Sequence, residues 1–318
     1  MTDRIPAVSA GAIEPVKVEG RPANIWRDTL GAVVRQRSAQ AGLAILGLLL
    51  LLAVGADVIA PFGPTQDLRY GDTPEQITRL TGPCVHLLGC DSSAPEHLFG
   101  VDGNFFDVFS RVVHGTRISL FIGFVTVGFA IVLGTLIGAV AGYAGGWADN
   151  VLMRLMDVVL SFPALILAIA IVTVIGSGLI QAQLAIGIVA IPIYARVMRA
   201  SVLSIKERDF VTASRALGES DRGILLRRIL PNALTPLIVQ GTLGIGGAVL
   251  EVAALSFLGL GAQPPIAEWG SMIGQNRNFI FNAPHLILFP GIALSLTVLG
   301  FNLLGDGMRD ALDPRLNR

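Results

Sequence analysis

The stretch from Ile118 to Ala148 reads ISLFIGFVTVGFAIVLGTLIGAVAGYAGGWA, and the next charged residue is Asp149. A helix needs about 20 mostly apolar residues to cross a bilayer, because each residue rises about 1.5 Å. The whole chain has the same character, since 53% of its 318 residues are hydrophobic and only 14% are charged. The sequence therefore predicts a membrane protein. It excludes a soluble globule, a disordered chain and a nucleic-acid binder with a basic face.

Further apolar runs predict the remaining membrane spans. The first run is too long for a signal peptide and follows roughly 40 polar residues, so we expect it to be retained. Only a Gly/Ser turn separates two of the runs, and five spans is therefore the alternative to six. The fold class expected is an all-α polytopic membrane protein with six transmembrane helices. Besides the run from Ile118, the runs are Ala41–Ala60, Val158–Gly176, Leu179–Met198, Leu234–Leu260 and His285–Leu304.

Basic residues set the orientation. With the N-terminus in the cytoplasm, 18 of the 23 Lys and Arg residues fall inside, as the positive-inside rule requires, and both termini are cytoplasmic. Eight of these 18 lie between Arg196 and Arg228. The segment before Trp26 has no apolar period and is expected to be disordered. The expected divisions are a cytoplasmic tail (1–40), a first helix (41–60), an extracytoplasmic loop (61–115), a core of five helices (116–305) and a cytoplasmic tail (306–318).

Both cysteines, Cys84 and Cys90, fall in the expected extracytoplasmic loop. Disulfides persist in oxidising compartments, and the flanking glycines and proline favour a turn. We expect a disulfide between them, with two free thiols as the alternative.

Small residues recur within the spans. Glycines at helical spacing let membrane helices approach closely, so we expect tight packing within the chain. An interface with a second chain is the alternative. The glycines are Gly134, Gly138 and Gly142 in one run, and Gly241, Gly244, Gly246 and Gly247 in another.

Glu251 is the acid of the fifth span. An ionisable group within a span is costly and usually faces the bundle interior or water. We interpret Glu251, together with Ser256 in the same run, as part of a translocation path. An interhelical hydrogen bond is the alternative for Glu251. Asp157 is expected to pair with Arg154 at i, i+3.

The polar segment between the fourth and fifth spans, residues 206–231, predicts a helix–Gly–helix unit. Phe210, Ala213 and Leu217 recur on one helical face, and Gly218 then favours a left-handed helix end. A second short helix is expected to end before Pro231. The segment is either a membrane-surface connector or a docking element for a cytoplasmic partner.

This segment resembles the EAA loop of ABC-importer permeases, which reads Glu-Ala-Ala, three residues, Gly and later Leu-Pro. Thr212 replaces the motif's Glu, and Ser214 replaces its second Ala. In that family the loop forms the coupling helix that sits in a groove of the ATPase. The resemblance implies this role for Thr212, Ala213, Ser214, Ala216, Leu217, Gly218, Glu219, Leu230 and Pro231.

Three more segments resemble the C-type permeases of dipeptide and oligopeptide importers. They are residues 97–120, 251–270 and 305–315. The first departs from the family pattern, because Phe105 and Phe106 stand where Gly-Arg is usual. Together the matches reach from the first span to the end of the chain.

The resemblance implies a type I ABC importer permease of the MetI-like fold in a bacterial inner membrane. It implies a second homologous (B-type) permease, two ATPase subunits or a fused pair, an extracytoplasmic substrate-binding protein and a peptide substrate. We expect no cofactor or metal in this chain. ATP and Mg would be bound by the ATPase subunits, because neither Lys17 nor Lys206 lies in a P-loop.

The sequence also allows alternative functions. One is the same ABC permease role for another substrate, because similar permeases carry nickel, haem or glutathione. A self-contained secondary transporter would show internal repeats, which this sequence lacks. An intramembrane enzyme would need a nucleophile or zinc motif, and neither Gly-x-Ser-x-Gly nor His-Glu-x-x-His occurs.

Overall fold

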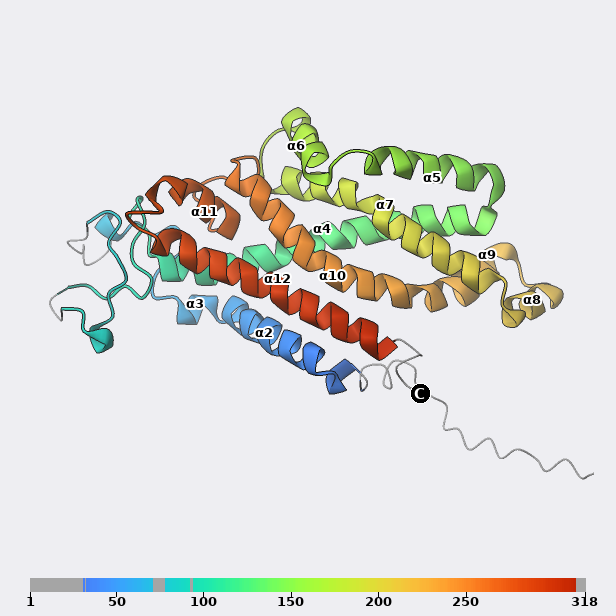
Figure 1. Ribbon diagram of the computed structural model, residues 1–318, viewed down its shortest axis with the longest axis horizontal. Helices are drawn as coiled ribbons and strands as arrows, with labels where there is room; N and C mark the ends of the chain where they lie inside the picture. The colour runs from blue at the N-terminus through green and yellow to red at the C-terminus, as the bar shows by residue number, and fades with distance from the viewer. Residues whose placement is uncertain (1–30, 32, 71–77, 92–93, 313–318) are drawn as a thin grey trace, which may run out of the picture.

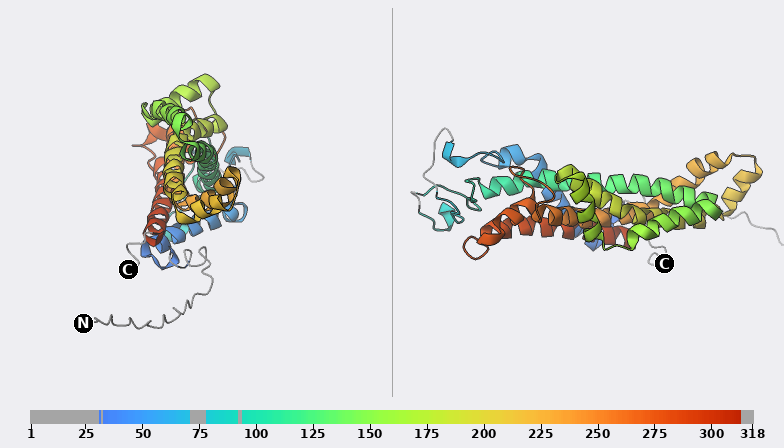
Figure 2. Two further views of the ribbon diagram at one scale, coloured as in Figure 1. Left: turned by 90° about the vertical axis from the view of Figure 1, so that its right-hand side faces the viewer. Right: turned by 90° about the horizontal axis from the view of Figure 1, so that it is seen from above.

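A computed structural model describes residues 31, 33–70, 78–91 and 94–312 of the chain. The expected tail before Trp26 and the last motif residues, 313–315, lie outside this part. The described residues form an elongated bundle of helices (Figures 1 and 2). They contain no strand, only isolated bridges between Cys84 and His97 and between Val101 and Asp107.

The long helices run along the length of the bundle. Two shorter helices, α5 and α6, form a bent pair. The helices are α2 (Arg37–Val54), α3 (Ala56–Ile59), α4 (Val108–Ala144), α5 (Gly146–Leu160), α6 (Ala164–Ile175), α7 (Leu179–Lys206), α8 (Asp209–Ala216), α9 (Asp221–Gly223), α10 (Leu230–Phe257), α11 (Trp269–Asn276) and α12 (His285–Leu312). A π-helical segment, η3 (Ile224–Ile229), joins α9 to α10, and short 3-10 turns lie at Leu68–Tyr70, His86–Leu88 and Arg277–Phe279.

Five stretches among the described residues are long and apolar enough to cross a membrane, and the bent pair α5 and α6 makes a sixth if it counts as one span. The prediction of one helix over Val158–Gly176 is wrong. The chain bends by 92° between α5 and α6, at residues 161–163. Pro163 is the cause, because proline lacks an N–H and disfavours helix at the residue before it. With 12 residues, α6 is too short to cross a bilayer alone.

Several helices extend beyond their apolar runs, and α4 and α12 are two examples. α4 begins at Val108 rather than Ile118, because the Asp107 carboxylate caps it by accepting hydrogen bonds from the backbone N–H and hydroxyl of Ser110, both at 2.7 Å. α12 continues from Leu304 to Leu312. Hydropathy locates the part of a helix that suits the membrane, whereas hydrogen bonding sets where the helix ends.

The second short helix of the 206–231 segment does not end before Pro231. The chain stays helical from Asp221 to Phe257, and η3 runs directly into α10. Pro231 lies where the π-helical segment η3 passes into α10. The fifth span and this segment therefore form one continuous element.

Close packing of α4 on α7 forms the centre of the bundle. A Cβ on Gly138 would overlap the Ala195 carbonyl, and one on Gly142 would lie 3.0 Å from the Val202 side chain. The prediction that this glycine stripe packs within the chain is confirmed. The second stripe is mixed, because a Cβ on Gly241 would meet Ile131 at 2.7 Å whereas one on Gly247 would meet nothing.

Helices α2 and α12 pack together along one side of the bundle (Figure 1). Backbone of α12 at Gly300 and Leu304 lies against Gly42 of α2, where a Cβ would be within 2.7 Å of both. Beyond α2, Arg117 of α4 donates to the Asp57 carboxylate at 2.9 and 3.0 Å. These contacts attach α2 and α3 to the rest of the bundle.

Candidate functional site

Residues 206–231, termed the inner loop, lie at one end of the bundle (Figure 1). α8 ends at Ala216, and Gly218 follows with φ of +83°, in the left-handed region that glycine adopts most easily. The N–H of Glu219 donates to the Ser214 carbonyl at 3.1 Å and closes the helix end. Ser220 then caps α9 by accepting a hydrogen bond from the N–H of Gly223. The chain thus turns sharply between two helices, as the sequence predicts.

The inner loop is attached firmly to the bundle. Val211, Ile224 and Ile229 are completely buried and belong to the main hydrophobic core. The Tyr143 hydroxyl at the end of α4 donates to the Asp221 carboxylate at 2.6 Å. Lys206 donates to the Gly142 carbonyl at 3.1 Å. A force on the loop would therefore reach α4, α7 and α10 directly.

The opposite side of the inner loop is exposed and partly apolar. Leu217 is 88% exposed and Leu226 is 63% exposed. Phe210 and Ala213, which share the predicted helical face with Leu217, are also exposed. Five arginines of the inner loop are exposed as well and are termed its basic rim; they are at positions 208, 215, 222, 227 and 228. The loop offers an apolar patch with a basic rim.

The structure brings most of the predicted loop residues together and separates two of them. Positions 212–219 occupy α8 and its C-terminal turn, and Thr212 and Ala213 face outward. Leu230 and Pro231 lie beyond η3, at the start of α10. Sequence reasoning missed Tyr143 and the anchors Val211, Ile224 and Ile229. The anchors are ordinary apolar residues, so only their burial marks them.

Ion pairs hold α5 against α7 near the same end. Arg199 donates to Asp149 at 2.5 and 2.6 Å, and Arg196 donates to Asp157 at 2.6 Å. The predicted pair of Asp157 with Arg154 is wrong. The 92° bend leaves α5 lying along α7, so a residue far along the chain becomes the nearer partner.

Glu251 lies on α10 and is partly exposed on the surface of the single chain. Among the described residues it forms no hydrogen bond or ion pair, and Tyr194 of α7 is its polar neighbour. Ser256 is 3% exposed and accepts the Ala262 N–H at 3.0 Å. It lines a cavity of about 390 Å³ that also includes Gln263.

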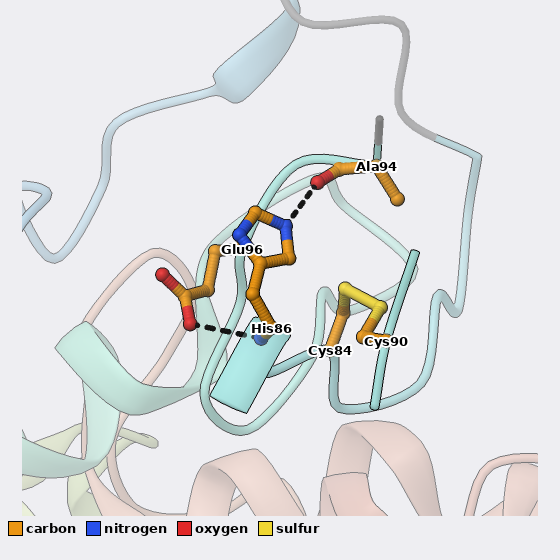
Figure 3. Close-up of a disulfide and its surroundings, with 5 residues drawn as sticks. All are labelled: Cys84, His86, Cys90, Ala94 and Glu96. Atoms are coloured by element: carbon orange, nitrogen blue, oxygen red, sulfur yellow. Dashed lines mark hydrogen bonds between the residues drawn. A yellow bond between two sulfur atoms is a disulfide. The ribbon is translucent and has the colours of Figure 1, made fainter. Parts of the chain in front are cut away.

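At the far end, the described part of the segment between α3 and α4, termed the outer loop (60–107), contains a disulfide. Cys84 and Cys90 are bonded, with Cα atoms 5.4 Å apart. Figure 3 shows the bridge beside His86, whose N–H donates to Glu96 at 3.1 Å and whose ring bonds the Ala94 carbonyl at 2.8 Å. Backbone hydrogen bonds of 2.9 and 3.0 Å join Cys84 to His97.

Buried polar groups join the outer loop to the helices. His97 and Asp107, 1% and 2% exposed as side chains, lie 3.0 Å apart. The Asp102 carboxylate accepts from Arg111 at 3.0 Å. Burial raises the pKa of Asp102 above its ordinary value, and the Arg111 guanidinium and two backbone N–H groups oppose this.

The segment after α10 is tied down in the same way. Trp269 is fully buried and donates to the Val112 carbonyl at 3.0 Å. Glu268 caps α11 by accepting from the N–H groups of Gly270 and Ser271 at 2.9 and 2.8 Å. Burial raises the pKa of Glu268, while these donors and Ser256 oppose the rise. The described residues contain no group of three or more His, Cys, Asp or Glu that could hold a metal.

Two family models match this chain. Residues 134–318 match the model of the binding-protein-dependent transport system inner membrane component. Residues 24–83 match the N-terminal transmembrane domain of oligopeptide transport permease C.

Curated relatives match over most of the chain. The dipeptide transport system permease protein DppC of Alkalihalophilus pseudofirmus is 43% identical over 92% of this chain and 90% of its own length. The glutathione transport system permease protein GsiD of Pectobacterium atrosepticum is 42% identical, covering 92% and 91%. The DppC protein of Haemophilus influenzae is 42% identical, covering 89% and 92%.

Solved structures show the same fold. A chain of the methionine ABC transporter MetNI in an inward-facing conformation superposes with a TM-score of 0.52 at 23% identity. The superposition covers 64% of this chain and 97% of that one. The expected MetI-like permease fold and the resemblance carried by the sequence motifs are both confirmed.

Proposed function

Because this chain belongs to the family of binding-protein-dependent transport system inner membrane components, we propose that it forms half of the translocation pore of an ATP-driven peptide importer. A second, homologous permease of the B-type completes the pore. Two ATPase subunits, or a fused pair, bind ATP and Mg and drive it, and this chain performs no catalytic step. An extracytoplasmic binding protein delivers the substrate. The chain spans the bacterial inner membrane with both termini in the cytoplasm.

The inner loop is the observation that carries this proposal. Its exposed apolar patch around Leu217 suits a groove on an ATPase, and the basic rim suits acidic groups around that groove. Its buried side is part of the bundle core. Closure of the ATPases on ATP would move the loop, and the contacts at Tyr143 and Lys206 would pass that movement to the helices. The Thr212 and Ser214 departures leave this geometry intact.

Glu251 supports a path along α10 and α7. A carboxyl group within a span needs a polar environment, and this one has no hydrogen-bonding partner among the described residues. Its partly exposed position would face the second permease in the assembled pore. Ser256 lies nearer the outer end of the same helix. We propose that Glu251 lines the path and that Ser256 contributes at its outer end.

Dipeptides and oligopeptides are the proposed substrates, by analogy with relatives that bear dipeptide names. Glutathione is the second candidate, because a relative named as a glutathione permease is 42% identical over 92% of this chain. Dipeptides and glutathione are both small peptides that carry free carboxylates.

Reconstitution tests the proposal. The chain is co-expressed with the other subunits of its system, purified and placed in liposomes with ATP inside or outside. We expect uptake of labelled dipeptides or glutathione that requires ATP on the cytoplasmic side and the binding protein on the other. Uptake without an ATPase partner would contradict the proposal and favour a secondary transporter. Uptake of nickel or haem, with neither peptide carried, would overturn the substrate assignment.

A further inference from the structure

A basic pocket lies at the outer-loop end, between that loop and the segment that leads into α11. Its volume is about 400 Å³. Arg69 and Arg79 reach it from the outer loop, and Arg111 reaches it from the first turn of α4. Phe105, Phe106, Pro264 and Pro265 form much of its apolar wall. Three guanidinium groups thus surround one small cavity.

Arg111 is buried in the pocket wall. Its exposure is 1%, and the Phe106 ring lies 4.8 Å from its Cζ atom. One guanidinium nitrogen donates to Asp102 at 3.0 Å, whereas Nε has no hydrogen-bond partner among the described residues. A buried donor left without a partner is costly, so this guanidinium retains unused hydrogen-bonding capacity in the pocket wall.

Arg69 and Arg79 flank the Phe105 ring, with Cζ atoms 4.3 and 5.5 Å from its centroid. Phe105 has φ of +62°, which is rare for a bulky residue and persists only where its surroundings hold it. Its carbonyl accepts the Leu68 N–H at 3.1 Å, so the backbone beside Arg69 is fixed to the backbone of Phe105. The aromatic ring therefore holds the two arginines at the pocket mouth.

The charges of the pocket do not balance within the described residues. Asp67 accepts three hydrogen bonds from the Arg69 side chain, at 2.6 to 3.2 Å. Asp102 is occupied by Arg111. Arg79 is exposed and has no acidic partner in the described part of the chain. Among the described residues, one positive charge is therefore left over at the mouth.

We propose that this pocket receives an acidic side chain of the extracytoplasmic binding protein when that protein docks. This inference rests on the proposed function. A planar carboxylate can accept paired hydrogen bonds from guanidinium groups, and the apolar walls strengthen such bonds by excluding water. The outer loop projects beyond the helices (Figure 2), so a soluble protein meets its exposed arginines first. Phe105 and Phe106, which stand where the family pattern has Gly-Arg, form part of the pocket wall that this side chain would contact.

Titration of the assembled transporter with its own substrate-loaded binding protein tests the pocket. The complex is held in nanodiscs, and Kd is measured at low and at physiological salt. Arg79→Glu should raise Kd about tenfold and weaken its salt dependence. Asp67→Asn should lower Kd, because it removes the acid that competes for Arg69 yet keeps an oxygen for the Arg69 backbone N–H, now accepted at 3.0 Å. Arg277→Glu is the matched control, since Arg277 is exposed on the same side but does not line the pocket.

Two further arms identify the source of the carboxylate. In one arm, the carboxylates of the binding protein are converted to amides with carbodiimide and glycine methyl ester. The modified binding protein should bind wild type and Arg79→Glu with the same Kd. Equal Kd values for wild type and both pocket variants would overturn the proposal. So would an effect confined to the KM for a peptide and absent for its C-terminal amide, because the pocket would then serve the substrate. Failure of wild type to bind any binding protein would instead contradict the proposed function.

Discussion

The Tyr143 hydroxyl, at the end of α4, donates a 2.6 Å hydrogen bond to the Asp221 carboxylate, at the start of α9. The bond joins α4 to the second half of the inner loop. Tyr143→Phe removes the donor and leaves the ring in place. We expect the free energy of unfolding to fall by about 1 kcal/mol, the usual net worth of such a bond. We also expect fewer peptides to be imported per ATP hydrolysed.

The measurement pairs a thermal melt with uptake and ATPase rates in liposomes. Asp221→Asn is the companion variant, because its side-chain oxygen still accepts the bond. It should retain more of the coupling than Tyr143→Phe. Unchanged peptide-to-ATP ratios in Tyr143→Phe would show that this bond transmits no movement.

Gly218→Val should uncouple ATP hydrolysis from uptake. The left-handed conformation at Gly218 costs a β-branched residue roughly 1–2 kcal/mol or more, although a Cβ there would meet no neighbouring atom. Gly218→Asn is the control, since asparagine tolerates this conformation and should preserve uptake. Normal uptake by the valine variant would show that the inner loop does not couple ATP hydrolysis to uptake.

Glu251→Leu should slow uptake several-fold without lowering the melting temperature, if the carboxyl lines the path. Glu251→Gln keeps a polar group of similar shape and should fall between the leucine variant and wild type. A drop in melting temperature with normal uptake per intact transporter would instead assign Glu251 to an interhelical hydrogen bond.

Acidification should stabilise the chain through Glu268. Its pKa in the folded protein is raised above the ordinary 4.5 by burial, so folding takes up a proton between those two values. Stability from this group is therefore complete below the unfolded pKa and is lost as the pH rises through the folded pKa. Relative to Glu268→Gln, the melting temperature of wild type should be higher at about pH 5 than at about pH 7.5. A constant difference between the two proteins would contradict this assignment.

Cys84 and Cys90 should resist alkylation until the protein is reduced. Mass spectrometry of the outer-loop peptide should then show two alkyl groups after reduction and none before it. The double variant Cys84→Ser with Cys90→Ser should cost about 2 kcal/mol, because the bridge closes only a short loop. Alkylation of the unreduced protein would refute the bridge.

The fold could be predicted largely from the sequence because apolar runs report membrane helices directly. The start of α7 at Leu179 and that of α12 at His285 agree with the predicted runs. The bend at Pro163 could not be predicted with certainty, since prolines inside α7 and α12 leave those helices continuous. Whether a proline breaks a span depends on what its neighbours supply.

Part of the candidate site could likewise be predicted from the sequence, and part of it could not. The Gly218 turn is a local property, and its residue type and spacing were enough to predict it. The partners of Asp157 and Asp221 come from helices far away in sequence, so only the packing reveals them. The pocket around Phe105 is also of this kind, because its arginines come from the outer loop and from α4.

The unbroken helical course from Asp221 to Phe257 has a mechanical consequence. Its 37 residues measure roughly 55 Å at about 1.5 Å per residue. A rod of that length pivoting at one end by about 10° carries its other end through roughly 10 Å. A modest rotation imposed at the inner-loop end would thus be amplified along the helix into a displacement wide enough to open or close a passage for a small peptide.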